Sequence, residues 1–163
     1  MSPSSNIVQL TMTGGLAPSW SPDGTRIAVG TKASGDVGAP AAFVMNAADG
    51  GNVVPLVPGA DPAWSPDGSR IALSFCPLFA VCDPDDNALA FIDPDGSGLT
   101  TPPGAHGVYQ PAWSRDGARL AVRLLPTRDA GTGGGSWIYS VSPDGTGYVL
   151  LSGPADHLPA WGP

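Results

Sequence analysis

The sequence predicts an all-β fold built from repeated four-stranded antiparallel units, and three observations support this prediction. The segment PAWSPDGSRIAL from Pro62 recurs from Pro18 and Pro111, and a shortened fourth copy, PAWGP, begins at Pro159. The repeated tryptophans follow one another at intervals of 44, 49 and 48 residues, a period typical of propeller blades. The 23 Gly and 19 Pro residues recur at fixed offsets between short apolar runs, as expected for tight turns joining short strands. The predicted fold class is therefore a β-propeller with three complete blades in this chain.

Each unit begins with a strand that carries the tryptophan, and a hairpin turn then leads into a second strand. The turn is Ser-Pro-Asp-Gly at 21–24 and 65–68, where Pro fixes φ at the second position and Gly takes a positive φ. In the third unit Arg115 replaces the Pro, but the Asp-Gly pair remains. The second strands, which start at Arg26, Arg70 and Arg119, are too short and too closely bounded by turns to be helices.

A third strand is expected near Phe43, Phe91 and Ile138, after a connection of variable length. It ends at a second Gly turn, from which a fourth strand returns as VVPLV, LTTP or YVLLSG. The expected boundaries are an N-terminal segment at 1–16 with the strand-like stretch NIVQLT, blades at 17–60, 61–109 and 110–157, and the start of a further blade at 158–163.

The repeated residues are expected to have structural roles. Each tryptophan can fill the space between neighbouring blades, and the Ala at 28, 72 and 121 allows close packing on the opposite face. Each repeated Arg lies three residues after the hairpin Asp, so a side-chain bridge across the turn is one expectation and a ring of Arg facing a ligand is another. The structural repeat comprises Trp20, Asp23, Gly24, Arg26, Trp64, Asp67, Gly68, Arg70, Trp113, Asp116, Gly117, Arg119 and Trp161.

The pattern Trp-Ser-Pro-Asp-Gly-x-Arg-Ile-Ala, followed by a hydrophobic strand and Asp-x-Asp-Gly, resembles the TolB-type β-propeller repeat, which is WD-like in shape. The resemblance extends from Ala17 to Trp161. It implies a propeller, commonly six-bladed, that acts chiefly as a binding platform in extracytoplasmic bacterial proteins. It does not imply an enzyme.

Three blades are fewer than the four to eight with which propellers close, so apolar blade faces are expected at both ends of the arc. A second copy could close a six-bladed ring, the chain could be part of a longer propeller, or a different propeller chain could complete the ring. The homodimer is the first expectation. The extra strand-like stretches at both ends fit a simple three-plus-three ring imperfectly, because they would form only the first and last strands of a fourth blade.

The acidic balance indicates which partners to expect. All 14 acidic residues are Asp, and the net charge of −7 argues against nucleic acid or an anionic membrane as a partner. Turn chemistry accounts for many of these carboxylates. Several others lie in variable connections that are expected to share one face, where they would attract a basic protein partner. The candidate partner-binding residues are Asp36, Asp61, Leu78, Phe79, Asp83, Asp85, Asp86, His106, Tyr109, Asp129 and His157.

The connection with the most unusual composition contains Cys76 and Cys82. A disulfide between them is the preferred interpretation, and it would place the protein in an oxidising compartment, periplasmic or extracellular; two reduced thiols in the cytoplasm are the alternative. The stretch MSPSSNIVQL has neither the basic start nor the apolar core that a signal peptide needs, so it is not expected to act as one. Asp83, Asp85 and Asn87 alternate like the start of a calcium loop but lack the Gly and Glu that complete it, so no metal and no cofactor are expected.

No catalytic set is evident in the sequence. His106 and His157 have no third metal ligand, and no nucleophile elbow or phosphate-binding loop occurs. The expected function is therefore a non-catalytic protein–protein interaction platform. The alternatives are a propeller that accompanies a hydrolase or peptidase, and a propeller that binds a carbohydrate or small ligand.

Overall fold

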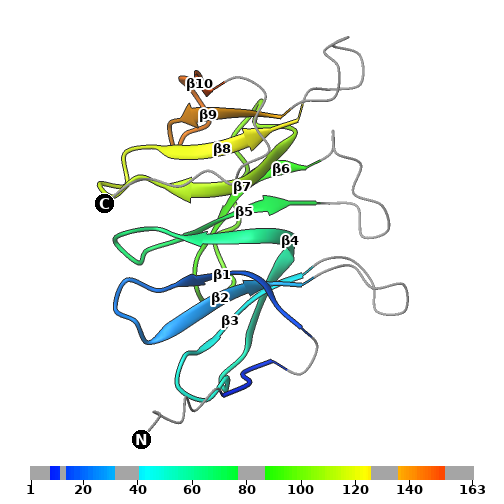
Figure 1. The fold of residues 1–163 in the computed structure, drawn as a ribbon, viewed down its shortest axis with the longest axis vertical. Helices are drawn as coiled ribbons and strands as arrows, with labels where there is room; N and C mark the ends of the chain where they lie inside the picture. The colour runs from blue at the N-terminus through cyan, green and yellow to red at the C-terminus, as the bar shows by residue number, and fades with distance from the viewer. Residues whose placement is uncertain (1–7, 12–13, 32–40, 77–86, 126–135, 153–163) are drawn as a thin grey trace, which may run out of the picture.

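The computed structural model describes residues 8–11, 14–31, 41–76, 87–125 and 136–152, and these residues form an all-β structure (Figure 1). Its strands lie in two antiparallel sheets, one in the order β1-β2-β3-β4-β5-β6 and the other in the order β10-β9-β8-β7. The all-β prediction is confirmed. The strands are β1 (Leu16–Trp20), β2 (Arg26–Gly30), β3 (Ala41–Asn46), β4 (Val54–Trp64), β5 (Ile71–Phe75), β6 (Ala88–Ile92), β7 (Val108–Trp113), β8 (Leu120–Leu124), β9 (Trp137–Val141) and β10 (Val149–Ser152).

The strands form three successive four-element blades. Blade 1 contains β1, β2, β3 and the first half of β4; blade 2 contains the second half of β4, β5, β6 and a return segment at Thr100; blade 3 contains β7 to β10. β4 belongs to two blades because the chain passes from one to the next without a loop. The expected connection GADP at 59 therefore lies inside an 11-residue strand, and Pro55 and Gly59 are part of its ladder.

The fourth strand of blade 2 is shorter than the sequence predicts. The stretch LTTP forms only an isolated bridge, in which Thr100 pairs with Phe91. Pro102 and Pro103 follow directly, and a proline has no N–H to donate to a ladder. The fourth strands of blades 1 and 3 lie in β4 and β10, as expected.

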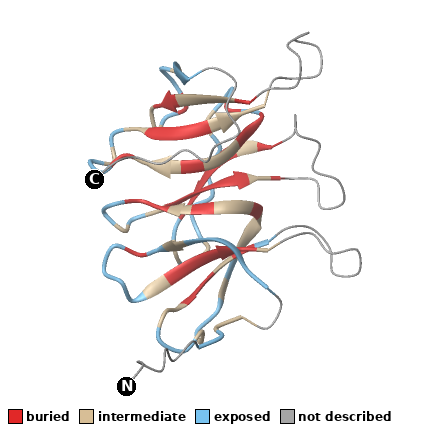
Figure 2. Ribbon diagram, in the orientation of Figure 1, coloured by how far each residue is buried: buried red, intermediate tan, exposed pale blue. Residues whose placement is uncertain are grey.

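The hydrophobic core lies between neighbouring blades, and the second strand of each blade contributes buried residues to it (Figure 2). Ala72 packs with Leu120 and Val122 between blades 2 and 3, whereas Ile71 and Leu73 pack with Ala28 and Val44 between blades 1 and 2. Successive residues of β5 thus serve opposite faces, because side chains alternate along a strand. The small Ala in the middle of each repeat allows the next blade to approach.

The repeated tryptophans lie in the joints between blades, as predicted, wherever a preceding blade is present. Trp64 packs on blade 1 and is 6% exposed. Trp113 packs on blade 2, with its ring centroid 5.6 Å from that of Phe91 and its Nε1 donating a 3.1 Å hydrogen bond to the Ala63 carbonyl. Trp20 has no blade before it and is 59% exposed.

The repeated arginines contact these rings. The Arg26 guanidinium carbon lies 5.0 Å from the centroid of Trp64, and that of Arg70 lies 5.1 Å from Trp113 and 4.9 Å from Phe91. A cation held over an aromatic face is attracted by the ring quadrupole. The charge of Arg26 is the smallest influence on the pKa of Asp23, so the main contact of this arginine is with the next blade and not across its own hairpin.

Each hairpin Asp instead closes its own turn. Asp23 accepts hydrogen bonds from the Ser21 hydroxyl and from the backbone and side chain of Thr25. These bonds lower its pKa to about 2, with the Ser21 bond as the largest cause. Asp67 has the same arrangement with Ser65 and Ser69, and its pKa is also lowered to about 2.

The open face of blade 1 is covered by the chain's own N-terminal part. Leu10 packs against Ile27, Val29 and Met45, which are all at most 6% exposed. The expectation of a bare apolar face at this end is therefore wrong for the middle of blade 1. The expected strand NIVQLT is not seen among residues 8–11, which are described and lie outside any strand.

Candidate functional site

The first strands of the three blades share a bulge directly before the repeated Pro-x-Trp. Ala17, Asp61 and Gln110 occupy equivalent positions and have φ values of 47°, 52° and 51°. The ladder shifts register at each of these places, because the following proline cannot donate a hydrogen bond. Left-handed backbone at a residue other than Gly costs on the order of 1 kcal/mol, and such strain clusters at functional sites.

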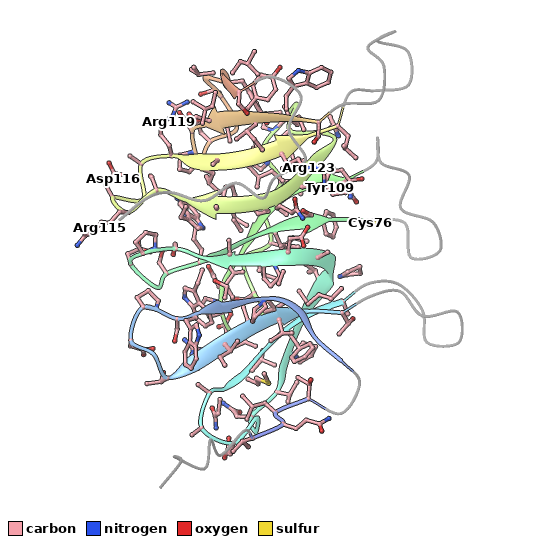
Figure 3. The ribbon with its side chains drawn as sticks, in the orientation of Figure 1. Cys76, Tyr109, Arg115, Asp116, Arg119 and Arg123 are labelled. Carbon is pink, nitrogen blue, oxygen red and sulfur yellow. The ribbon has the colours of Figure 1, made fainter. Side chains whose placement is uncertain are left out.

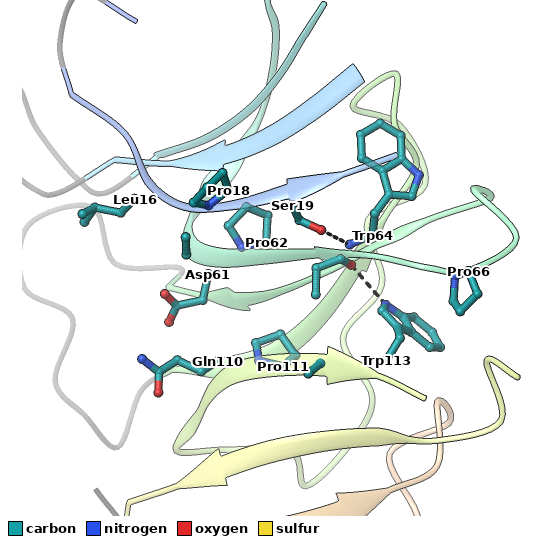
Figure 4. A pocket seen from close by; sticks show the side chains of 13 residues that line it. Leu16, Pro18, Ser19, Asp61, Pro62, Trp64, Pro66, Gln110, Pro111 and Trp113 are labelled. Atoms are coloured by element: carbon teal, nitrogen blue, oxygen red, sulfur yellow. Dashed lines mark hydrogen bonds between the residues drawn. The ribbon is translucent and has the colours of Figure 1, made fainter. Parts of the chain in front are cut away.

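A groove of about 650 Å³ runs along these three segments (Figure 4). Its walls are mostly Pro, Ala and Trp, and its polar groups include Asp61 and Gln110. The lining residues are Leu16, Ala17, Pro18, Ser19, Asp61, Pro62, Ala63, Trp64, Pro66, Gln110, Pro111, Ala112 and Trp113. Two hydrogen bonds fix the walls across blade boundaries. The backbone N–H of Trp64 donates to Ser19 Oγ at 2.9 Å, and the indole Nε1 of Trp113 donates to the Ala63 carbonyl.

Asp61 is the ionisable residue of the groove, and its environment perturbs it. Burial raises the pKa of the Asp61 carboxyl above its ordinary value of 3.8. A hydrogen bond from the Gln110 backbone N–H and the positive charge of Arg123 act in the opposite direction but do not outweigh burial. The same N–H lies 3.2 Å from the hydroxyl oxygen of Ser74, a residue that is 2% exposed. Asp61 is thus held at the joint between blades 2 and 3.

Two buried polar atoms beside Asp61 have no hydrogen-bond partner within the described part of the chain. They are Gln110 Oε1, an acceptor, and Arg123 Nε, a donor. Arg123 lies opposite Tyr109 in the β7–β8 ladder, one residue from Gln110. Buried polar atoms are nearly always paired with protein, water or ligand. Of these two residues Gln110 lines the groove, and together with Asp61 it forms the polar corner of the groove.

The groove's polar corner lies on the variable face, which is defined here as the side where β2, β5 and β8 end. Antiparallel pairing places the hairpin turns on the opposite side, and Figure 3 shows Arg115, Asp116 and Arg119 there, with Cys76, Tyr109 and Arg123 on the variable side. The two faces expected from the sequence are therefore present, and Asp61 and Tyr109 belong to the variable one.

Few of the predicted partner-binding residues can be placed. Asp61 lines the groove, Tyr109 is next to Gln110, and His106 is exposed and pairs with Ala88 in an isolated bridge. The rest lie outside the described residues: Asp36, Leu78, Phe79, Asp83, Asp85, Asp86, Asp129 and His157. Trp161, the fourth repeated tryptophan, also lies outside them.

The cysteine and metal predictions are partly addressed. Cys76 is 1% exposed and is disulfide-bonded; the only other cysteine of the sequence, Cys82, lies outside the described residues. Asn87 is buried at 7% exposure, whereas Asp83 and Asp85 are not described. Among the residues that are described, no three of His, Cys, Asp and Glu lie close enough together to hold a metal ion.

Gln110 and Arg123 were not predicted as site residues. A signal for Gln110 was present: the residue before Pro-x-Trp varies among Ala17, Asp61 and Gln110 while its surroundings are nearly constant. A variable residue on a constant scaffold is a candidate for binding. Arg123 carries no such signal, because its place beside Asp61 depends on the joint between two blades.

Comparison with known proteins shows the fold. No protein-family model and no curated protein matches the sequence. Among solved structures, a TolB-type protein of Agrobacterium tumefaciens aligns with a TM-score of 0.65 and 18% identity, over 86% of this chain and 50% of its own. An acylaminoacyl peptidase of Pyrococcus horikoshii aligns with a TM-score of 0.61 and 15% identity, over 85% and 24%.

The β-propeller domain of the trilobed protease of Pyrococcus furiosus aligns with a TM-score of 0.57 and 14% identity, over 87% of this chain and 43% of its own. The chain thus spans half or less of the length of each of these three structures. At such identities the likeness concerns the fold alone: this chain has the fold of part of a β-propeller, as predicted. In the described residues there is no helix long and apolar enough to span a membrane.

Proposed function

We propose that this chain is a non-catalytic β-propeller platform that binds a polypeptide partner in the groove and on the variable face. The observation that carries the proposal is the pair of equivalent bulged residues, Asp61 and Gln110. They bring a half-buried carboxylate and an unpaired buried amide oxygen to one end of an otherwise apolar groove.

A peptide satisfies each feature of this groove. Its amide groups can hydrogen-bond with the side chain of Gln110, which lines the groove and whose Oε1 lacks a partner. Its apolar side chains can bury against the Pro, Ala and Trp walls. A Lys or Arg of the peptide would neutralise Asp61, whose ionised form is disfavoured by burial. A sugar would form the hydrogen bonds but would not explain the apolar walls as well.

The charge of the chain favours a basic partner. The net charge is −7, and Asp36, Asp83, Asp85, Asp86 and Asp129 are expected on the same face as Asp61. Carboxylates gathered on one face raise the rate of encounter with a basic protein. The periplasm or the extracellular space is the proposed location, a view supported by the disulfide-bonded state of Cys76.

Titration with a short basic peptide tests the proposal, with the same peptide carrying Glu in place of Lys as the comparison. Calorimetry should detect binding of the basic peptide only. Asp61→Asn, and a separate triple variant with Asn at 83, 85 and 86, should each weaken binding by roughly tenfold, about 1.4 kcal/mol. Asp144→Asn is the matched control, because it removes the same charge from the turn after β9, which antiparallel pairing with β8 places on the opposite face.

Two results would count against this function. The first is equal binding of the acidic and basic peptides. The second is an equal loss of affinity in Asp61→Asn and Asp144→Asn, because a general effect of net charge would then explain the binding. A rise in affinity at low salt should accompany specific binding, since exposed charges are screened.

A further inference from the structure

Exposed apolar side chains gather at the two ends of the arc. Trp20 is 59% exposed and Leu16 is 42% exposed at the blade 1 end. Val149, Leu150 and Leu151 of β10 are 51–54% exposed at the blade 3 end. Exposed apolar patches of this kind mark interaction surfaces. Both ends of one chain therefore present surface that a neighbouring blade would bury.

The chain itself shows how such surfaces are buried, because the same joint occurs twice within it. The repeated Trp of one blade lies over the repeated Arg of the blade before it, as Trp64 does over Arg26 and Trp113 over Arg70, with ring-to-guanidinium distances of 5.0 and 5.1 Å. In the first joint the fourth strand also contributes, since Val54, Leu56 and Val57 pack into the layer between the blades.

The two ends carry complementary halves of this joint. Trp20 is the repeated Trp without a preceding blade, and Arg119 is the repeated Arg of the last described blade. Arg119 is already held in place at the edge of blade 3, where Nη2 donates to the Gly147 carbonyl at 2.6 Å and Nε donates to the Ser140 hydroxyl. In the fourth strand of blade 3, Val149–Leu151 occupy the positions equivalent to those of Val54–Val57 in the joint between blades 1 and 2.

We propose that a second copy of this chain closes the ring, with Trp20 of each copy lying over Arg119 of the other. Two arcs of three blades give six blades, which is within the range in which propellers close. The contact is head-to-tail, and a twofold axis generates it twice, so no surface of this kind is left open. Both joints would repeat the geometry that blades 1 and 2 already form.

The N-terminal segment competes with this closure. Leu10 packs on Ile27, Val29 and Met45, the layer that corresponds to Ile71 and Leu73 in the first joint. In a closed ring β10 of the second copy would take the place of Leu10. The segment Val8–Thr11 therefore covers the surface that a second copy would contact, so its removal favours the dimer. Leu10→Asp should accordingly raise the dimer fraction.

Sedimentation equilibrium of the full chain tests the closure. The expected mass is twice 16.4 kDa. Trp20→Asp and Arg119→Glu should each give monomers that keep the far-ultraviolet circular dichroism of the parent. Leu99→Asp is the control, because Leu99 is 42% exposed but lies in blade 2, the middle blade, next to Thr100.

Mixing the two variants gives the sharper result. A Trp20→Asp copy paired with an Arg119→Glu copy has one altered joint and one native joint, so the mixture should recover dimer that neither variant forms alone. A monomeric parent chain, a dimer that tolerates Trp20→Asp, or a mixture that stays monomeric would each overturn the proposal. If the parent is a monomer destabilised by Trp161→Ala, the chain's own fourth tryptophan occupies the site in place of a second copy.

Discussion

The repeated tryptophan allows one substitution to be compared in different surroundings. Trp113→Ala removes an indole from the joint between blades 2 and 3, where it contacts Phe91 and Arg70 and donates to the Ala63 carbonyl. Trp20→Ala removes the same side chain from a place with no blade before it. The local repeat sequence is nearly identical, so any difference in the cost reports on the joint alone.

The expected cost of Trp113→Ala follows from its contacts. The pair with Phe91, at 5.6 Å, contributes about 0.5–1.5 kcal/mol, and the guanidinium of Arg70 contributes about 0.5–1 kcal/mol at a partly exposed site. The hydrogen bond to Ala63 adds about 1 kcal/mol. Loss of packing brings the total to about 3 kcal/mol, the lower end of the range for truncating a buried aromatic. Trp20→Ala should cost under about 0.5 kcal/mol in the monomer, as for other exposed side chains.

Urea unfolding followed by circular dichroism measures both costs. The protein should be dilute enough to be monomeric, so that Trp20 is tested without a second copy. Trp113→Ala should lower the unfolding midpoint clearly and Trp20→Ala should barely change it. Equal losses would refute the assignment of the tryptophan to the joint, because they would show that its cost comes from within its own blade.

Three further predictions concern the fold and the groove. Gly59→Ala should lower the free energy of unfolding in urea by about 1–3 kcal/mol, because its Cβ would lie 2.5 Å from Leu73 Cδ1 and 2.7 Å from the Ser74 carbonyl oxygen. An unchanged unfolding midpoint would show that β4 is not packed this closely. The free energy of unfolding should fall between about pH 4 and pH 2. Asp23 and Asp67 have folded pKa values of about 2, below the ordinary 3.8, so their stabilising ionised form is lost as they are protonated. A variant with Ala at both positions should show a smaller fall, and an equal fall would contradict their role. Asp61→Asn should raise the melting temperature at pH 7, because the folded pKa of Asp61 lies above its ordinary value and its ionisation therefore opposes folding. Asn keeps an acceptor for the Gln110 N–H and tolerates a positive φ. A lower melting temperature would mean that attraction to the positive charge of Arg123 outweighs the cost of burying the carboxylate.

Most of the fold could be predicted from the sequence because its information is local and repeated. The hairpin turns, the Trp before each turn and the alternation in the second strands recur three times, so each copy supports the others. The continuous strand β4 could not be foreseen, because whether GADP forms a loop depends on how far apart the two blades lie. The shortening of the fourth strand of blade 2 to a single bridge can be explained from the sequence, since Pro102 and Pro103 have no N–H to extend the ladder.

The candidate site was less accessible from the sequence. The repeat predicts structural roles for its residues, yet the residue before each Pro-x-Trp lines the groove. Asp61 was named because it lies in a connection, whereas its perturbation arises from burial between blades and from Gln110 and Arg123 of the next blade. Contacts of this kind join residues about 50 positions apart and leave no local pattern. The role first expected for the arginines was likewise local, and the structure directs them to the next blade.

Mapping of backbone amide chemical shifts during titration with the basic peptide tests the central claim most directly, that binding occurs at the groove and not elsewhere on the propeller. The account predicts the largest changes at Asp61, Gln110 and Arg123, with little change at the turns around Asp95 and Asp144. Changes concentrated at those turns, with none at Asp61 and Gln110, would contradict it.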